Sequence, residues 1–256
     1  MKRMIPNTIT LINLFSGCMA LICIFTNALE LVPFFIAIGL LSDYTDGLAA
    51  RLLKVSSELG KELDSLADMV SFGVVPGAML FYMINETLGI DQIDFYRPST
   101  FWGVIGFLVT LFACLRLAKF NLDTRQTEGF VGLNTPACTI FVLGLLIIVL
   151  KDTYGLRHFV LQAPFLYGLS FVLAYLLVAE IPMFSFKFKS LKWKGNRVRF
   201  LFILLTLVWI IAFPLGLALT LVTSSYVLLS VVLWLFGILK KEGIEGEEDI
   251  VEGEEY

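Results

Sequence analysis

Long apolar stretches alternate with short polar connections along the chain. We distinguish eight such stretches, with centres near residues 19, 40, 72, 108, 141, 172, 208 and 228. Each is about 18–24 residues long, close to the ~20 residues that a helix needs to cross ~30 Å of hydrocarbon. The apolar segment 200–239 is too long for one crossing, and we divide it at Pro214-Leu215-Gly216. The pattern predicts an all-α, polytopic membrane protein with about eight transmembrane helices.

Composition and charge agree with a membrane protein and predict its orientation. Hydrophobic residues make up 58% of the 256 residues and charged residues 16%, which excludes an ordinary soluble fold. With eight spans, every Lys and Arg except Arg97, Lys151 and Arg157 falls on the same side. The positive-inside rule then predicts that both termini are cytoplasmic, in the plasma (inner) membrane. A seven-span arrangement would move Lys240 and Lys241 to the outside, and we therefore prefer eight spans.

Two segments differ in composition from the rest of the chain. Residues 242–256 carry eight acidic residues and no basic ones. We interpret residues 1–241 as one membrane domain and residues 242–256 as a disordered acidic tail. The connection 187–199 carries six basic residues interleaved with aromatic ones. Because it lies between two predicted spans, we interpret it as an orientation determinant that contacts anionic lipid headgroups, and we expect no nucleic-acid partner.

Four aspartates lie in stretches that are otherwise apolar enough to cross a membrane: Asp43, Asp46, Asp64 and Asp68. An ionised carboxylate near the bilayer centre costs roughly 2.5–3.5 kcal/mol, so these charges require compensation. The first two are spaced i,i+3 and the last two i,i+4, so each pair shares one face of a helix. If the two pairs converge, they form an all-oxygen site suited to Mg²⁺ or Mn²⁺.

Three functions are compatible with such a cluster: an ion or proton pathway, a structural network of ion pairs, and a metal site for phosphoryl transfer. Small residues and one arginine favour the third. Gly47, Ala50 and Gly60 leave room for a ligand beside the carboxylates. Arg51 offers a planar set of donors that suits phosphate oxygens. A proton relay requires neither feature.

The segment 43–68 also matches a known motif as a whole. Its pattern, D-x2-D-G-x2-A-R-x8-G-x3-D-x3-D, resembles the signature of the CDP-alcohol phosphotransferase family. The resemblance implies a reaction in which a hydroxyl attacks the phosphorus of a CDP-linked lipid and expels CMP. It implies two divalent ions, Mg²⁺ or Mn²⁺, held by Asp43, Asp46, Asp64 and Asp68, with Asp68 also accepting the proton of the hydroxyl. The residues implied to contact the CDP-lipid, or to leave room for its nucleotide, are Gly47, Ala50, Arg51, Ser57 and Gly60.

The N-terminal stretch resembles the serine-using members of this family. Residues 5–14 carry the pattern P-N-x2-T-x2-N, in which Asn7, Thr10 and Asn13 recur at i, i+3 and i+6 and would face in one direction. The resemblance implies that Asn7 and Thr10 contact the CDP-lipid. A helix cap followed by an interfacial polar stripe is the alternative explanation.

Residues 114–137 resemble the serine-using members as well, except that Asn134 stands where those members have a proline. Arg116, Lys119 and Asn121 fall at the cytoplasmic end of the fourth predicted span. The resemblance implies that they hold the carboxylate of serine while its hydroxyl faces the metals. Basic side chains that merely reach the interface from a helix end are the alternative.

The resemblance as a whole implies transfer of the phosphatidyl group of CDP-diacylglycerol to L-serine, with phosphatidylserine and CMP as products. The lipid would enter from the inner leaflet, among other membrane lipids, and serine would arrive from the cytosol. Members of the family are commonly dimers, so we expect a homodimer. The alternatives are the same chemistry with another acceptor, such as glycerol 3-phosphate or an inositol phosphate, and a cation transporter.

Overall fold

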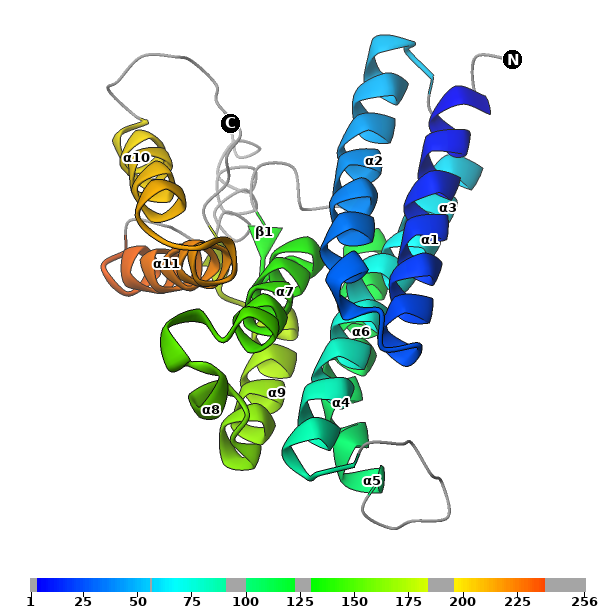
Figure 1. The fold of residues 1–256 in the computed structure, drawn as a ribbon. Helices are drawn as coiled ribbons and strands as arrows, with labels where there is room; N and C mark the ends of the chain where they lie inside the picture. Colours follow the sequence, from blue (N-terminus) through cyan, green and yellow to red (C-terminus); the bar gives the residue numbers. More distant parts are fainter. Residues whose placement is uncertain (1–3, 56, 91–99, 123–129, 184–195, 238–256) are drawn as a thin grey trace, which may run out of the picture.

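The computed structural model describes residues 4–55, 57–90, 100–122, 130–183 and 196–237. Most of these residues are helical (Figure 1). Two short strands, β1 (Phe130–Val131) and β2 (Pro182–Met183), form an antiparallel pair in which Phe130 is opposite Met183. The predicted all-α class is therefore confirmed, with this two-residue ladder as a minor addition. The predicted acidic tail lies outside the described residues.

The first two helices, α1 (Met4–Phe25) and α2 (Val32–Leu52), are antiparallel and lie side by side (Figure 1). They are joined through the short 3-10 helix η1 (Leu29–Leu31). A glycine lets them approach closely, since a Cβ added to Gly39 of α2 would lie only 3.2 Å from Oδ1 of Asn13 on α1. This close packing brings the polar face of α1 against the helix that carries the first two aspartates.

The next rod consists of α3 (Glu58–Asp68), η2 (Met69–Val74) and α4 (Val75–Thr87). Ser57 caps its N-terminus, because the Ser57 Oγ accepts a hydrogen bond from the Gly60 N–H at 3.0 Å. The η2 segment is a turn of π-helix, in which the N–H of Val75 bonds to the carbonyl of Val70, five residues earlier. Residues 58–87 therefore do not form one uniform α-helix.

The other helices complete a bundle around α4 and α7. They are α5 (Thr100–Gly103), η3 (Val104–Phe107), α6 (Leu108–Leu122), α7 (Thr135–Lys151), η4 (Thr153–Gly155), α8 (Arg157–Val160), α9 (Ala163–Val178), α10 (Arg197–Ala212) and α11 (Leu215–Leu235). The core includes Met79 and Met83 of α4 and Leu146 of α7, all completely buried. α10 buries only Phe202 and exposes many large apolar side chains, as a lipid-facing helix does.

The eight predicted apolar stretches all coincide with helical segments. Each predicted centre falls within a helix or within η2. The chain breaks between Ala212 and Leu215, so the break includes Pro214, whereas Leu215 and Gly216 of the predicted break already belong to α11. By length and composition, five helical segments of the described residues are suited to cross a membrane: Met4–Phe25, Leu29–Leu52, Glu58–Thr87, Phe101–Leu122 and Leu215–Leu235. The structure thus agrees with a membrane protein, whereas the number of eight spans and the cytoplasmic termini stay predictions.

α11 contacts α7 at a point where both helices carry glycine, and in Figure 1 its axis lies at a steep angle to α1 and α2. A Cβ added to Gly144 of α7 would lie 2.8 Å from the carbonyl oxygen of Gly216 on α11. A Cβ added to Gly216 would lie 2.9 Å from the carbonyl oxygen of Gly144. The two backbones therefore touch directly, which only small residues permit.

We expect Gly144→Ala to destabilise the protein by about 1–3 kcal/mol, because the new methyl group must push the two backbones apart. Gly168→Ala on α9 is the matched control, since a Cβ there has no atom within 4 Å and alanine is the better helix former. The Tm of each variant is measured by thermal unfolding in detergent. If the Tm of Gly144→Ala equals or exceeds that of Gly168→Ala, the close crossing is contradicted.

Candidate active site

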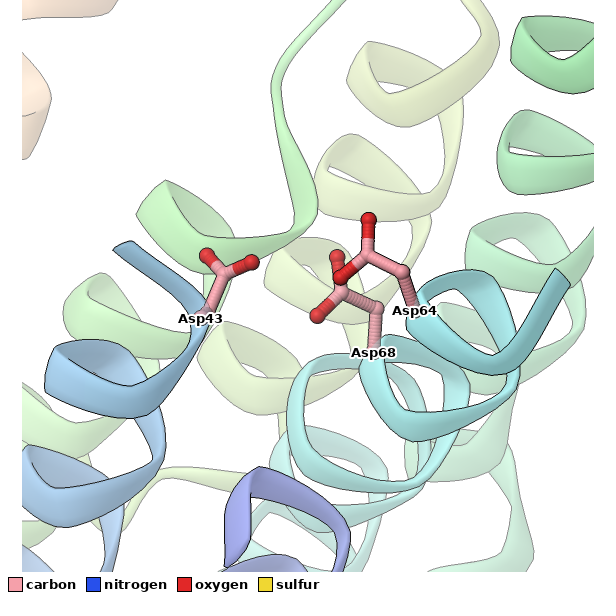
Figure 2. A group of neighbouring side chains, drawn as sticks. All are labelled: Asp43, Asp64 and Asp68. Atoms are coloured by element: carbon pink, nitrogen blue, oxygen red, sulfur yellow. The ribbon is translucent and has the colours of Figure 1, made fainter. Parts of the chain in front are cut away.

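Three aspartates from two helices converge on one point. One carboxylate oxygen from each of Asp43, Asp64 and Asp68 lies within 4.8 Å of the other two, and all three side chains are partly buried. Figure 2 shows Asp64 and Asp68 next to each other on α3, with Asp43 facing them from α2. The i,i+4 spacing on α3 therefore places two carboxylates on one helical face, as the sequence predicts, and the packing of α2 supplies the third.

These carboxylates lack an ion-pair partner among the lysines and arginines that the structure describes. The ion pairs found there join Lys151 to Glu30 and Arg157 to Glu86, away from the three aspartates. Unit charges 4.8 Å apart repel each other by about 3–4 kcal/mol at an effective dielectric constant of ~20. In addition, Oδ1 of Asp64 is buried and has no hydrogen-bond partner. This oxygen-only donor set fits a hard divalent cation such as Mg²⁺ or Mn²⁺.

Two polar side chains of α1 bind aspartates of the neighbouring helices. Thr10 Oγ1 donates a hydrogen bond to Asp46 Oδ2 at 2.5 Å, and Asn13 Nδ2 donates to Asp68 Oδ1 at 3.1 Å. Thr10, Asn13 and Asp46 are buried, with exposed fractions of 3%, 0% and 6%. Hydrogen bonds to a carboxylate are stronger than those between neutral groups, and they fix its orientation. α1 thus determines which carboxylate oxygens remain available to a ligand.

The structure brings together three of the four predicted metal ligands. Asp46 lies close enough to Asp43 and Asp64 to repel them electrostatically, but its carboxylate is bonded to Thr10 and is not part of the convergent group. The Thr10 hydroxyl bonds an aspartate, and the predicted contact of Thr10 with the CDP-lipid stays a prediction. The i, i+3, i+6 spacing places Asn13 on the same face of α1 as Asn7 and Thr10, and its bond to Asp68 is what the sequence does not predict.

Three residues expected at the CDP-lipid lie together near the start of α3. A Cβ added to Gly60 would lie 3.0 Å from Ser57 Oγ and 3.3 Å from Asn7 Oδ1, so a side chain at position 60 would crowd both. At Gly47 an added Cβ has no atom within 4 Å, and this face of α2 is open. The other two predicted contacts lie in the last turn of α2, one half-buried and one exposed: Ala50 and Arg51.

The three residues predicted to bind serine do not form one cluster. Arg116 is buried within α6, its exposed fraction is 8%, and its Nε has no hydrogen-bond partner. It lies close enough to Asp68 for electrostatic attraction. Lys119, in contrast, is exposed. The Asn121 amide Nδ2 donates a hydrogen bond to Ser65 Oγ at 2.8 Å, which ties the end of α6 to α3. Of the three, Arg116 is the one with an electrostatic interaction with one of the aspartates, Asp68.

Comparison with known proteins gives the class to which this architecture corresponds. The chain belongs to the CDP-alcohol phosphatidyltransferase family, whose family model matches residues 3–239.

Several curated relatives share one name, CDP-diacylglycerol–serine O-phosphatidyltransferase. The Helicobacter pylori (strain J99) protein is 28% identical over 237 residues, which cover 92% of each chain. The Bacillus subtilis (strain 168) protein is 31% identical over 185 residues, 72% of this chain and 91% of the relative. The Saccharomyces cerevisiae protein is 35% identical over 160 residues, 56% of this chain and 53% of the relative. This chain is thus similar to enzymes named for a serine acceptor.

Thr10→Val should lower phosphatidyltransferase activity roughly tenfold or more, because a buried hydrogen bond to a carboxylate is lost without a change in side-chain volume. Thr8→Val is the control, since the Thr8 hydroxyl is exposed and bonds only to the carbonyl of Met4 within its own helix. Initial rates with purified variants, together with their Tm values, separate lost activity from lost folding. Equal rates for the two variants would contradict a role of Thr10 in holding Asp46.

Proposed function

We propose that this protein transfers the phosphatidyl group of CDP-diacylglycerol to the hydroxyl of L-serine and releases CMP. The observation that carries the proposal is the convergence of three partly buried carboxylates without a lysine or arginine ion-pair partner among the described residues. The names of the relatives support serine as the acceptor. The lipid would approach from the inner leaflet, between helices that expose apolar side chains, and serine would come from the cytosol.

The aspartate cluster would hold two divalent ions, Mg²⁺ or Mn²⁺. Asp43, Asp64 and Asp68 would be ligands, and Asp46 would join them through the oxygen that Thr10 does not bond. Bound ions would neutralise the pyrophosphate and stabilise the departing CMP. The buried and unpartnered Oδ1 of Asp64 is an observation that favours this assignment.

Asp68 would act on the acceptor directly. Asn13 bonds Oδ1 of this carboxylate, so Oδ2 is the oxygen that can accept the proton of the serine hydroxyl. The serine oxygen then forms a bond to the lipid-side phosphorus, and the bond from that phosphorus to the oxygen of CMP breaks. Asn13 keeps Asp68 in one orientation during this transfer, which is the advantage of a preorganised base.

The CDP-lipid would lie along the open side of α2 and the start of α3. Gly47 leaves space beside the aspartates, and Gly60 keeps the region next to Asn7 and Ser57 free of a side chain. Arg51, exposed in the last turn of α2, would bind phosphate oxygens. Ala50 would leave room for the nucleotide.

Arg116 would bind the carboxylate of serine, because it is buried, lies close enough to Asp68 for electrostatic attraction and has an unpartnered Nε. Lys119 would contribute only long-range attraction, since it is exposed. Asn121 would act through its hydrogen bond to Ser65, by holding α6 against α3.

The topology follows the same proposal. Residues 1–241 would form one membrane domain with about eight spans, and both termini and the aspartates would face the cytoplasm. Arg51 at the end of α2 and Lys61 at the start of α3 lie on the side of the bundle that carries the aspartates, in agreement with the positive-inside rule. The acidic segment 242–256 would lie outside this domain. A homodimer in the inner membrane is proposed from the family resemblance alone.

The direct test uses labelled serine and CDP-diacylglycerol in mixed micelles, with and without Mn²⁺. We expect phosphatidylserine and CMP in equal amounts, only when both CDP-lipid and metal are present. Asp64→Asn should reduce the rate to below about 1% while the protein remains folded, because the neutral amide is a much weaker metal ligand. Incorporation of glycerol 3-phosphate in place of serine would refute the acceptor. Metal flux in proteoliposomes without CMP release would refute the enzyme.

Arg116→Ala should raise the KM for serine about tenfold or more and change the KM for CDP-diacylglycerol much less, because a charge-assisted hydrogen bond to one substrate is removed. Arg116→Lys keeps the charge but loses the planar donor set, so its KM for serine should lie between those of wild type and Arg116→Ala. Steady-state kinetics with each substrate varied in turn measure this difference. An unchanged KM for serine in Arg116→Ala would remove this residue from the acceptor site.

A further inference from the structure

The π-helical turn η2 begins directly after Asp68 and has a cause in the sequence. Pro76 lacks the N–H that an α-helix would use to bond the carbonyl of Phe72, and its ring crowds that carbonyl. The helix widens ahead of Pro76, and Val75 bonds back to Val70. Residue 76 therefore cannot donate to the carbonyl of Phe72, and a donor from another helix can take that place.

Hydroxyls from two other helices lie within hydrogen-bond distance of carbonyl oxygens in the turn. Thr139 Oγ1 of α7 lies 3.2 Å from the carbonyl oxygen of Phe72 and 3.0 Å from that of Thr135 in its own helix, so its one proton is shared between the two. Thr110 Oγ1 of α6 lies 2.8 Å from the carbonyl oxygen of Gly73. Thr139 is completely buried. The π-helical turn is thus fixed from two sides by side chains that do not belong to its own helix.

A third hydroxyl connects this turn to the aspartates. Ser71 Oγ donates to the carbonyl of Asn13 at 2.9 Å, and the Asn13 amide donates to Asp68 at 3.1 Å. Close packing makes this possible, because a Cβ added to Gly17 of α1 would lie 2.9 Å from the Cα of Ser71. The turn, α1 and Asp68 are therefore linked in one closed loop of contacts.

The turn sets the rotation of α3 about its own axis. A π-helical turn contains one residue more than an α-helical turn, and one residue corresponds to a rotation of about 100°. α4 is buried on nearly all sides, so it does not rotate to accommodate a change. If residues 69–74 became α-helical, Asp64 and Asp68 would turn away from Asp43 by an angle of this order.

We propose that Thr139 and Thr110 are positioning residues, which hold the π-helical turn and thereby direct Asp64 and Asp68 towards Asp43. They lie away from the reacting atoms and act only through the backbone of residues 72 and 73. The catalytic consequence rests on the proposed function above. The effect on cation binding by the aspartates does not depend on which acceptor is used.

The test compares Mn²⁺ binding by Thr139→Val, Thr139→Ser and wild type, measured by electron paramagnetic resonance titration. We expect Thr139→Val to bind Mn²⁺ roughly tenfold more weakly, the scale of one buried hydrogen bond left unmade. Thr139→Ser keeps the hydroxyl and should bind within about twofold of wild type. Thr223→Val is the matched control, because this buried threonine bonds only to the carbonyl of Leu219 in its own helix. It should bind Mn²⁺ like wild type.

A double-mutant cycle with Pro76→Ala tests the mechanism. Alanine restores an N–H that can bond the Phe72 carbonyl in an α-helical turn, so Pro76→Ala alone should already weaken Mn²⁺ binding. Thr139→Val should then weaken Mn²⁺ binding much less in the Pro76→Ala background than in wild type. If Thr139→Val does not fold, Thr110→Val takes its place with the same expectation for binding. Wild-type Mn²⁺ affinity in the folded valine variant, or additive effects in the cycle, would overturn the proposal.

The two proposals fail in different ways. If wild type transfers no phosphatidyl group to serine but Thr139→Val still weakens Mn²⁺ binding, only the acceptor assignment fails and the positioning role stands. If Asp64→Asn abolishes Mn²⁺ binding while Thr139→Val leaves it unchanged, the metal site stands and the positioning role is refuted.

Discussion

Mutual repulsion of carboxylates is the constraint on which this structure depends. Asp43, Asp64 and Asp68 converge within 4.8 Å in a partly buried setting, where like charges repel strongly. Such an arrangement is costly to fold unless a ligand of opposite charge offsets it. Neutral donors bond carboxylates of this cluster and of the adjacent Asp46. They are the hydroxyl of Thr10 and the amide of Asn13, which orient the carboxylates without neutralising their charge. The divalent cations that we propose for this site would offset the repulsion.

Glycines let the helices around the carboxylates approach each other more closely than larger residues would allow. Gly39 lets α2 approach Asn13, and Gly17 lets α1 approach Ser71, so three rods meet close to the carboxylates. The π-helical turn after Asp68 then sets the rotation of α3 relative to the buried α4. Small residues, a proline and hydroxyls from neighbouring helices thus contribute to the geometry of groups that they do not touch. This explains why polar side chains lie deep in an otherwise apolar bundle.

Local spacing made part of this predictable from the sequence. The i,i+4 pair Asp64 and Asp68, the break at Pro214 and the helices around all eight predicted centres follow from periodicity and helix chemistry. The rotation of one helix relative to another cannot be predicted from periodicity, because tertiary contacts determine it. For this reason Thr10 bonds Asp46 and Lys119 is exposed, although both have the residue types expected at a substrate. Pro76 is evident in the sequence, but the π-helical turn ahead of it is also held by Thr139, which is distant along the chain.

The most direct test of the account is the anomalous scattering of Mn²⁺ in crystals of the wild-type protein grown with that ion. The account predicts anomalous difference peaks between α2 and α3, with Asp43, Asp64 and Asp68 as ligands. Peaks elsewhere, or an ordered site without any peak at saturating Mn²⁺, would contradict the claim that these aspartates are arranged around divalent cations.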